Sequence, residues 1–92
     1  MKELDPLLHS QLRLAVMAIL MNVEEADFVF LKEKTSATSG NLSVQIDKLQ
    51  AAGYVSVEKV FVGKKPRTVC RVSDIGKKAF AEYADALRDY IG

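Results

Sequence analysis

The stretch ATSGNLSVQIDKLQAA, residues 37–52, decides the fold of this chain of 92 residues. Within it, Leu42, Ile46 and Leu49 recur at the spacing of a helix, which places three apolar side chains on one face. The stretch opens with small polar residues, and the face opposite the apolar side chains carries short polar groups, one valine and one cation. The residues of that outer face are Asn41, Ser43, Val44, Gln45 and Lys48.

The composition of this outer face leaves two interpretations open. A helix face that meets only solvent is usually richer in charged residues such as glutamate and lysine. Asparagine and glutamine are side chains that pair bidentately with adenine in the major groove of DNA. The helix is therefore either an ordinary amphipathic surface helix or one that reads base edges, and the segments around it must decide.

The length and the cysteine count restrict the class of protein. Ninety-two residues predict one domain, residues 1–92, since a typical domain has roughly 100–150 residues. No apolar stretch approaches the ~18 residues of a membrane span, and no cleavage-site pattern of a signal peptide follows a charged N-terminal region. The single cysteine, Cys70, excludes an internal disulfide framework and a multi-cysteine zinc site. We expect a cytoplasmic protein with no membrane contact, no cofactor and no metal.

The net charge of +1 conceals an uneven distribution of charges along the chain. Residues 39–78 carry eight cations and three anions, whereas the rest of the chain carries five cations and nine anions. A basic half and an acidic half indicate one face that meets a polyanion. The alternative is that the charges segregate by chance in so short a chain.

The residues before the stretch predict a buried helix. The pair Asp5-Pro6 is typical of a helix start, because proline suits the first helical turn, and Ser10 is an N-cap for a second start. Residues 11–22 are apolar on most sides, which predicts a central helix that is buried on most sides, with its two methionines as packing residues. This helix is also a candidate for part of a subunit contact.

A second, shorter helix lies directly before the stretch. Asp27 is a natural N-cap for a helix that ends near Ser36, and the pattern allows a brief extended segment around residues 26–28. The turn of residues 35–38 is built of serine, threonine and alanine, and Thr38 caps the helix that follows. Two helices joined by a tight turn, the second of them with a polar outer face, predict a helix-turn-helix.

The residues after the stretch alternate as β-strands do. Gly53 ends the helix, and residues 54–62 alternate with many β-branched and aromatic side chains, which predicts a strand. Residues 63–66, Gly-Lys-Lys-Pro, predict a turn, and residues 68–72 predict a second strand. Together they predict an antiparallel hairpin with a basic tip, formed by Lys64, Lys65 and Arg67.

The C-terminal residues 74–91 predict an amphipathic helix that Ser73 caps, with Gly76 as a weak position near its start. Its apolar stripe is long for so small a body, and burial by dimerisation would help a small domain. We therefore predict a dimer interface from the C-terminal half of this helix and one residue of the central helix. The alternative is docking of the stripe on the first helix of the same chain. The predicted interface residues are Leu12, Tyr83, Leu87, Tyr90 and Ile91.

The order of the predicted elements is helix, helix, helix, strand, basic tip, strand, helix. This order is the layout of a winged helix-turn-helix, an α+β fold that is mainly α. It has a three-helix core, a two-stranded β-hairpin as the wing, and a C-terminal helix. Such a layout can place a helix in the major groove and a cationic wing on phosphates or in the adjacent minor groove. The sequence therefore favours double-stranded DNA as the partner.

A resemblance to a known family is carried by LDP at 4–6, GNLS at 40–43, DKLQAAGYV at 47–55, GKKPRT at 63–68 and VSDIGKKAF at 72–80. With these runs the chain resembles, over nearly its whole length, small winged-helix transcriptional regulators related to the MarR and ArsR superfamilies. The resemblance implies a DNA-binding homodimer, usually a repressor. It places groove-reading positions on Ser39, Asn41, Ser43, Val44, Gln45 and Lys48, and wing positions on Lys64, Lys65 and Arg67. Metal-sensing relatives use clustered cysteines and histidines, whereas this chain has only Cys70 and His9.

Other functions have weaker support in the residues. Nucleophilic catalysis needs a nucleophile, a base and an orienting partner, which one histidine and one cysteine far apart do not supply. We expect Cys70 to be buried and inert, with redox sensing as the alternative. The acids Glu24, Glu25 and Asp27 are interpreted as a solvated turn and not as a metal site. Two alternatives stay open: a winged-helix module that binds protein in place of DNA, and a small-molecule effector, identified by no residue, that binds between the helices of the dimer.

Overall fold

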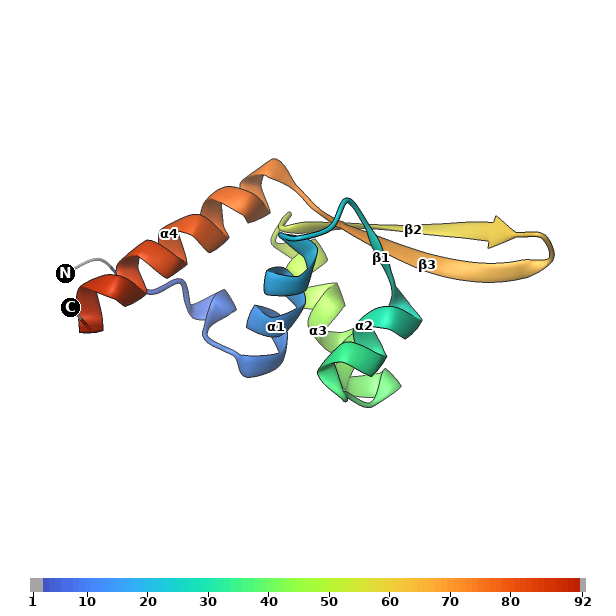
Figure 1. The fold of residues 1–92 in the computed structure, drawn as a ribbon, viewed down its shortest axis with the longest axis horizontal. Coiled ribbons are helices and arrows are strands. Elements are labelled where there is room, and N and C mark those ends of the chain that lie inside the picture. Colours follow the sequence, from blue (N-terminus) through green and yellow to red (C-terminus); the bar gives the residue numbers. More distant parts are fainter. Residues whose placement is uncertain (1–2, 92) are drawn as a thin grey trace.

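The computed structural model describes residues 3–91 (Figure 1). Three successive helices form the body, a strand pair projects from it in one direction, and a long last helix extends in the other. The molecule measures 51 × 25 × 21 Å because of these two projections. In chain order the elements are η1 (Pro6–Leu8), α1 (Gln11–Leu20), β1 (Ala26–Asp27), α2 (Phe28–Thr35), α3 (Ser39–Ala51), β2 (Val55–Val62), β3 (Lys65–Val72) and α4 (Asp74–Ile91).

Both ends of α3 are fixed by local hydrogen bonds. Thr38 accepts a hydrogen bond from the Asn41 amide at 3.1 Å through its side-chain oxygen, as an N-cap does. At the other end Gly53 has a φ of 79°, and the amide of Tyr54 donates to the Leu49 carbonyl at 2.9 Å. This pattern of a left-handed glycine and a backward hydrogen bond closes a helix. The predicted helix-turn-helix, α2 followed by α3, is therefore confirmed.

The sheet has one strand more than the predicted hairpin. It is antiparallel in the order β1-β3-β2, so β3 is central. β2 and β3 pair along their whole length, ending with Val62 opposite Lys65. β1 adds two residues, which lie opposite Val69 and Cys70. The extended segment allowed by the sequence before α2 is thus a strand, and it ties the start of α2 to the base of the wing.

The turn of the wing is shorter than predicted. Only Gly63 and Lys64 connect the two strands, and Gly63 has a φ of 64°, as the first residue of a type II′ hairpin turn requires. The sequence predicts Pro66 in the turn, whereas it lies opposite Phe61 within β3. Proline is tolerated at this position because β1 pairs only with the base of β3, so that near the tip β3 has a free edge.

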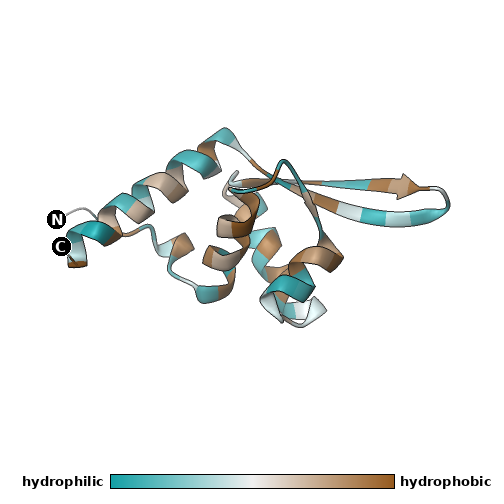
Figure 2. Ribbon diagram, viewed as in Figure 1, coloured by the Kyte–Doolittle hydropathy of each residue, from teal (hydrophilic) through white to brown (hydrophobic). Residues whose placement is uncertain are grey.

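The core lies where α1 meets the inner faces of α2, α3 and the sheet. The three apolar residues that predicted α3 are buried: Leu42 and Leu49 completely, and Ile46 with 4% of its surface exposed. In α1, Met17 is also completely buried and acts as a packing residue. Figure 2 shows α1 as hydrophobic over most of its length, whereas α4 alternates between hydrophilic and hydrophobic bands.

The start of α4 is seated on the backbone that follows α3. Ser73 caps α4 by accepting a hydrogen bond from the Gly76 amide at 3.0 Å, and its own amide donates to the Tyr54 carbonyl at 2.9 Å. Gly76 is buried, and a Cβ added to it would lie 2.2 Å from that carbonyl oxygen. The interpretation of Gly76 as a weak helical position is therefore corrected, because the missing side chain is what allows this contact.

Candidate nucleic-acid interface

The outer face of α3 forms an open polar surface. Gln45 is half-buried, which distinguishes it from the other predicted groove-reading positions. Those others are all exposed: Ser39, Asn41, Ser43, Val44 and Lys48. Five of the six predicted positions are therefore open to solvent, and one is partly covered.

Gln45 is covered because Arg13 of α1 reaches it. Arg13 donates from Nη1 to Oε1 of Gln45 at 2.5 Å, and from Nε to the Leu7 carbonyl at 2.6 Å. Nε2 of Gln45 in turn donates to Oδ1 of Asn41 at 3.0 Å. We call Arg13, Gln45 and Asn41 the amide relay. The sequence analysis missed Arg13, whose only signal was a charged residue within an apolar run.

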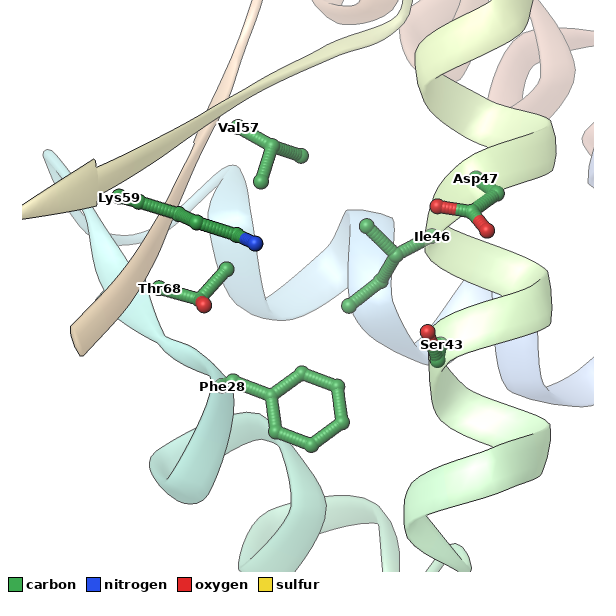
Figure 3. Close-up of a pocket in the computed structure, with 7 residues that line it drawn as sticks. All are labelled: Phe28, Ser43, Ile46, Asp47, Val57, Lys59 and Thr68. Carbon is green, nitrogen blue, oxygen red and sulfur yellow. The ribbon is translucent and has the colours of Figure 1, made fainter. Parts of the chain in front are cut away.

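A groove of about 370 Å³ separates α3 from the base of the wing (Figure 3). Ser43 and Asp47 line it from α3, Lys59 and Thr68 line it from the wing strands, and Phe28 lines it from α2. Figure 3 shows the side chain of Lys59 extending from β2 toward α3. Lys59 thus adds a cation between the helix and the wing, in a position that the predicted wing residues did not include.

The three predicted wing cations differ in their surroundings. Lys64 and Lys65 are exposed at the tip, and no side chain within residues 3–91 forms a hydrogen bond or an ion pair with either of them. Arg67 lies farther down β3, and its Nη2 is 2.6 Å from Oδ2 of Asp27. Two of the three cations are therefore able to meet phosphate directly, whereas Arg67 must first leave its carboxylate.

Asp27 holds two elements together. Its Oδ1 accepts a hydrogen bond from the Phe30 amide at 2.8 Å and so caps α2, and its Oδ2 accepts from Arg67 at 2.6 Å. The hydrogen bond from the Phe30 amide, and after it the Arg67 guanidinium, hold the pKa of Asp27 below its ordinary value of 3.8. The carboxylate is therefore more stable in the folded chain than in the unfolded one.

Asp27→Asn should reduce the acid dependence of stability. Because the folded pKa is the lower one, the contribution of the ionised carboxylate is complete above pH 3.8 and is lost as the pH falls through the folded value. Asparagine keeps the N-cap. We expect the variant to lose up to about 1 kcal/mol at neutral pH, and the loss to shrink below pH 3.8. Urea titrations across the pH range would measure the free energy of unfolding of both proteins. A loss that stays constant down to pH 2 would contradict the assignment. The control variant Asp27→Ala also removes the N-cap and should therefore lose about 1 kcal/mol more than Asp27→Asn at every pH.

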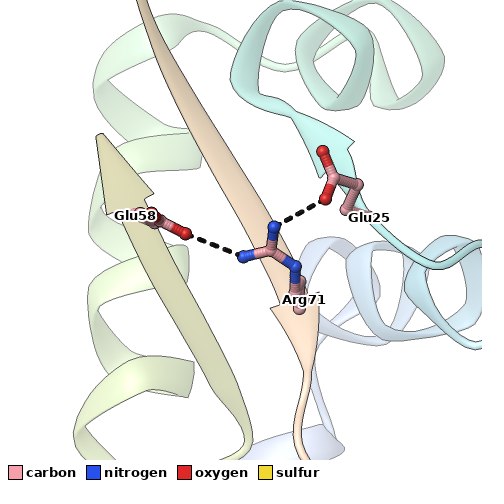
Figure 4. A network of polar contacts seen from close by, with 3 residues as sticks. All are labelled: Glu25, Glu58 and Arg71. Carbon is pink, nitrogen blue, oxygen red and sulfur yellow. Dashed lines mark hydrogen bonds and ion pairs between the residues drawn. The ribbon is translucent and has the colours of Figure 1, made fainter. Parts of the chain in front are cut away.

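A second network ties the acidic turn to the sheet (Figure 4). Arg71 of β3 lies between two carboxylates, with Nη2 2.6 Å from Glu25 Oε1 and Nη1 3.0 Å from Glu58 Oε2. The turn before α2, predicted to be solvated, thus places Glu25 on Arg71 and Asp27 on Arg67. These pairs neutralise two of the cations that made residues 39–78 basic. The excess positive charge of residues 39–78 therefore rests on lysines: Lys48, Lys59, Lys64, Lys65, Lys77 and Lys78.

Comparison with known proteins agrees with this geometry. The sequence model of a family described as "Winged helix DNA-binding domain" matches residues 12–91. The chain belongs to the winged helix DNA-binding domain family. This winged-helix domain is also 32% identical over 75 residues to an uncharacterized protein of Methanocaldococcus jannaschii, and the match covers 82% of each chain.

The winged-helix domain is similar to solved structures of transcriptional regulators. A transcriptional regulator homologue from Pyrococcus horikoshii is 29% identical with a TM-score of 0.88, over 95% of this chain and 86% of that chain. Bacillus subtilis PadR, solved in complex with operator DNA, is 15% identical with a TM-score of 0.72, over 82% of this chain and 48% of that chain, a likeness of fold alone. The predicted fold and class are confirmed: a winged-helix DNA-binding protein of the kind found in transcriptional regulators.

The remaining candidate groups of the winged-helix domain lie away from this surface. Cys70 is completely buried, and burial, with Asp27 as a second cause, raises the pKa of its thiol to about 11. It is therefore protonated at neutral pH and closed to solvent, as predicted. Nδ1 of His9 lies 3.3 Å from the hydroxyl of Tyr83. Across residues 3–91, no three or more His, Cys, Asp or Glu side chains gather as metal ligands. No helix in that range has the length and hydropathy of a membrane span.

The predicted dimer residues of the winged-helix domain fall into two groups. Tyr83 is only 7% exposed and belongs to the core of its own chain, so the alternative of docking within the chain is correct for this residue. Leu12 is half-buried and packs against the same core. The end of α4 remains open, and the predicted interface there consists of Leu87, Tyr90 and Ile91, which are 41%, 52% and 82% exposed.

Proposed function

We propose that this winged-helix domain, residues 1–92, represses transcription as a cytoplasmic homodimer bound to a two-fold related site on double-stranded DNA. In this arrangement the two copies of α3 lie in successive major grooves about 34 Å apart, and the wings contact the flanking backbone. One observation carries the proposal: the exposed Ser43 of the predicted α3 face, and Lys59 and Thr68 of the strands of the lysine-tipped wing, border the same groove (Figure 3). A single duplex can therefore meet both.

The proposal divides the interface into two kinds of contact. Asn41, Ser43 and their neighbours on α3 face the base edges and carry sequence preference. Lys64 and Lys65 face phosphates, which supply affinity for any sequence and a dependence on salt. Arg67 contributes less to phosphate binding, because its guanidinium already pairs with Asp27 at 2.6 Å.

The test is a binding-site selection from random duplexes, followed by a sizing measurement of the complex. We expect an enriched sequence with two-fold related half-sites about one helical turn apart, and two chains per duplex. No enrichment together with no duplex binding would exclude DNA binding and favour the protein-binding alternative. A single enriched half-site occupied by one chain would exclude the dimer. If the protein is a repressor, a reporter gene whose promoter overlaps the selected site should be expressed less when the protein is present.

Leu87→Glu should convert the homodimer to a monomer. The side chain is 41% exposed, so the fold of the monomer tolerates the charge, whereas an apolar interface does not. Sedimentation at micromolar concentration should show one chain in place of two, and affinity for a two-half-site duplex should fall at least about tenfold because the two copies no longer bind as a unit. Ile75→Glu is the matched control, because Ile75 is 64% exposed on the same helix but lies twelve residues away, or about 18 Å. Equal dissociation in both variants would contradict this interface.

A further inference from the structure

We propose that Arg13, which lies outside the recognition helix, sets the base preference of that helix by fixing the direction of the amide relay. When Arg13 donates to Gln45 and Gln45 donates to Asn41, the side chain of Asn41 presents its amide N–H groups to the DNA. Asn41 therefore selects hydrogen-bond acceptors on the base edge and prefers guanine to adenine. The inference rests on the proposed DNA binding by α3 and deepens it. It assigns a positioning role to Arg13 and a chemical class to the base that Asn41 meets.

Arg13 is held at two points before it reaches Gln45. It is the third residue of α1, whose N-cap Ser10 accepts a hydrogen bond from the Arg13 amide at 3.4 Å. Its Nε donates to the Leu7 carbonyl at 2.6 Å, which fixes the plane of the half-buried guanidinium. Nη1 is then aimed at Gln45, 2.5 Å away on α3. The contact joins residues 32 positions apart and is therefore a product of the packing of α1 against α3.

The chemistry of arginine decides which way the amides point. A guanidinium has five N–H donors and no acceptor, so only the oxygen of Gln45 can face Arg13. The amide nitrogen of Gln45 must then face away from it, and it donates to Oδ1 of Asn41 at 3.0 Å. Asn41 is left with its oxygen engaged and its amino group exposed on the surface of α3, where no residue within 3–91 accepts from it.

The orientation of the side-chain amides of Gln45 and Asn41 changes which base each of them can bind. The bidentate contact of asparagine or glutamine with adenine needs an oxygen acceptor for N6 and an amino donor for N7. In the relay both amide oxygens already accept a hydrogen bond, from Arg13 and from Gln45. Guanine presents two acceptors, N7 and O6, in the major groove. An exposed amino group therefore fits guanine better than adenine, which differs from the expectation for free asparagine and glutamine side chains.

The test compares Arg13→Met with Lys64→Met in binding-site selection and in titrations with duplexes that differ by guanine or adenine at one position of each half-site. Wild type should prefer guanine there by about tenfold. Arg13→Met should lose most of that preference and accept adenine, whereas Lys64→Met, which removes one phosphate-facing cation from the wing tip, should weaken both duplexes equally and keep the preference. Gln45→Met should behave as Arg13→Met does, without altering α1. Thermal unfolding confirms that each variant folds.

A measurement on the free protein separates this inference from the proposed function. In the nuclear magnetic resonance spectrum of wild type, the side-chain amide protons of Gln45 should exchange slowly with water, and Arg13→Met should shift and accelerate them. Wild type that binds no duplex but shows this protection would overturn the proposed function and leave the relay as a structural contact. Wild type that prefers adenine at this position, or an Arg13→Met variant that weakens both duplexes equally, would overturn the inference.

Discussion

Reversing both charges at the wing tip, Lys64→Glu together with Lys65→Glu, should weaken binding to every duplex by on the order of 50-fold per chain at 0.1 M salt. Each lysine on a phosphate releases about one counterion, so the slope of log affinity against log salt should fall by about two per chain. Sequence preference should stay, because phosphate contacts position the protein without reading bases. Fluorescence anisotropy titrations with a selected and a scrambled duplex, from 50 to 300 mM salt, would measure both quantities.

The matched control for the wing is Lys77→Glu together with Lys78→Glu. It makes the same change in net charge at the start of α4, which Figure 1 shows at the opposite end of the strand pair from the wing tip. Only the long-range field of the protein changes there, and salt screens that field beyond about 10 Å. We expect a loss of a few-fold at most. If the two double variants weaken binding equally, net charge explains the effect and the wing assignment is wrong.

The parts of this fold that follow from the sequence are those fixed by neighbours along the chain. Thr38 and Gly53 delimit α3 through hydrogen bonds that reach three to five residues, and Leu42, Ile46 and Leu49 bury one face through helical periodicity alone. The alternating side-chain pattern of residues 54–62, after Gly53, likewise predicts the first strand of the wing. Because these signals are local, the sequence alone predicts the order of the elements and, from that order, the class of protein.

The details of the candidate site depend on partners that are distant in the sequence. Gln45 meets Arg13 across 32 positions, Arg67 meets Asp27 across 40, and Arg71 meets Glu25 across 46. No periodicity specifies such pairs, because each results from how helices and strands pack. The consequence is substantial: charge counting made Arg67 and Lys64 equivalent, and residue type made Gln45 a free reader of adenine, whereas the contacts distinguish them.

Gly76→Ala should destabilise the chain by about 2–4 kcal/mol, although alanine is the better helix former. The added Cβ would lie 2.2 Å from the carbonyl oxygen of Tyr54 and 2.9 Å from its carbonyl carbon. Both are backbone atoms, so no side-chain rotation can relieve the overlap. α4 has to move away, at the cost of the hydrogen bond from the Ser73 amide to the same carbonyl. Urea unfolding followed by circular dichroism would measure the loss.

Gly40→Ala is the internal control, because the same substitution should there have the opposite sign. Gly40 lies in α3, and a Cβ added to it would meet no atom within 4 Å. We expect a gain of about 0.5–1 kcal/mol from helix propensity. The pair thus separates steric contact from propensity. A neutral or stabilising Gly76→Ala would mean that α4 is not seated on Tyr54, and the exposed end of α4, with Leu87 and Tyr90, would then have no fixed position from which to form a dimer.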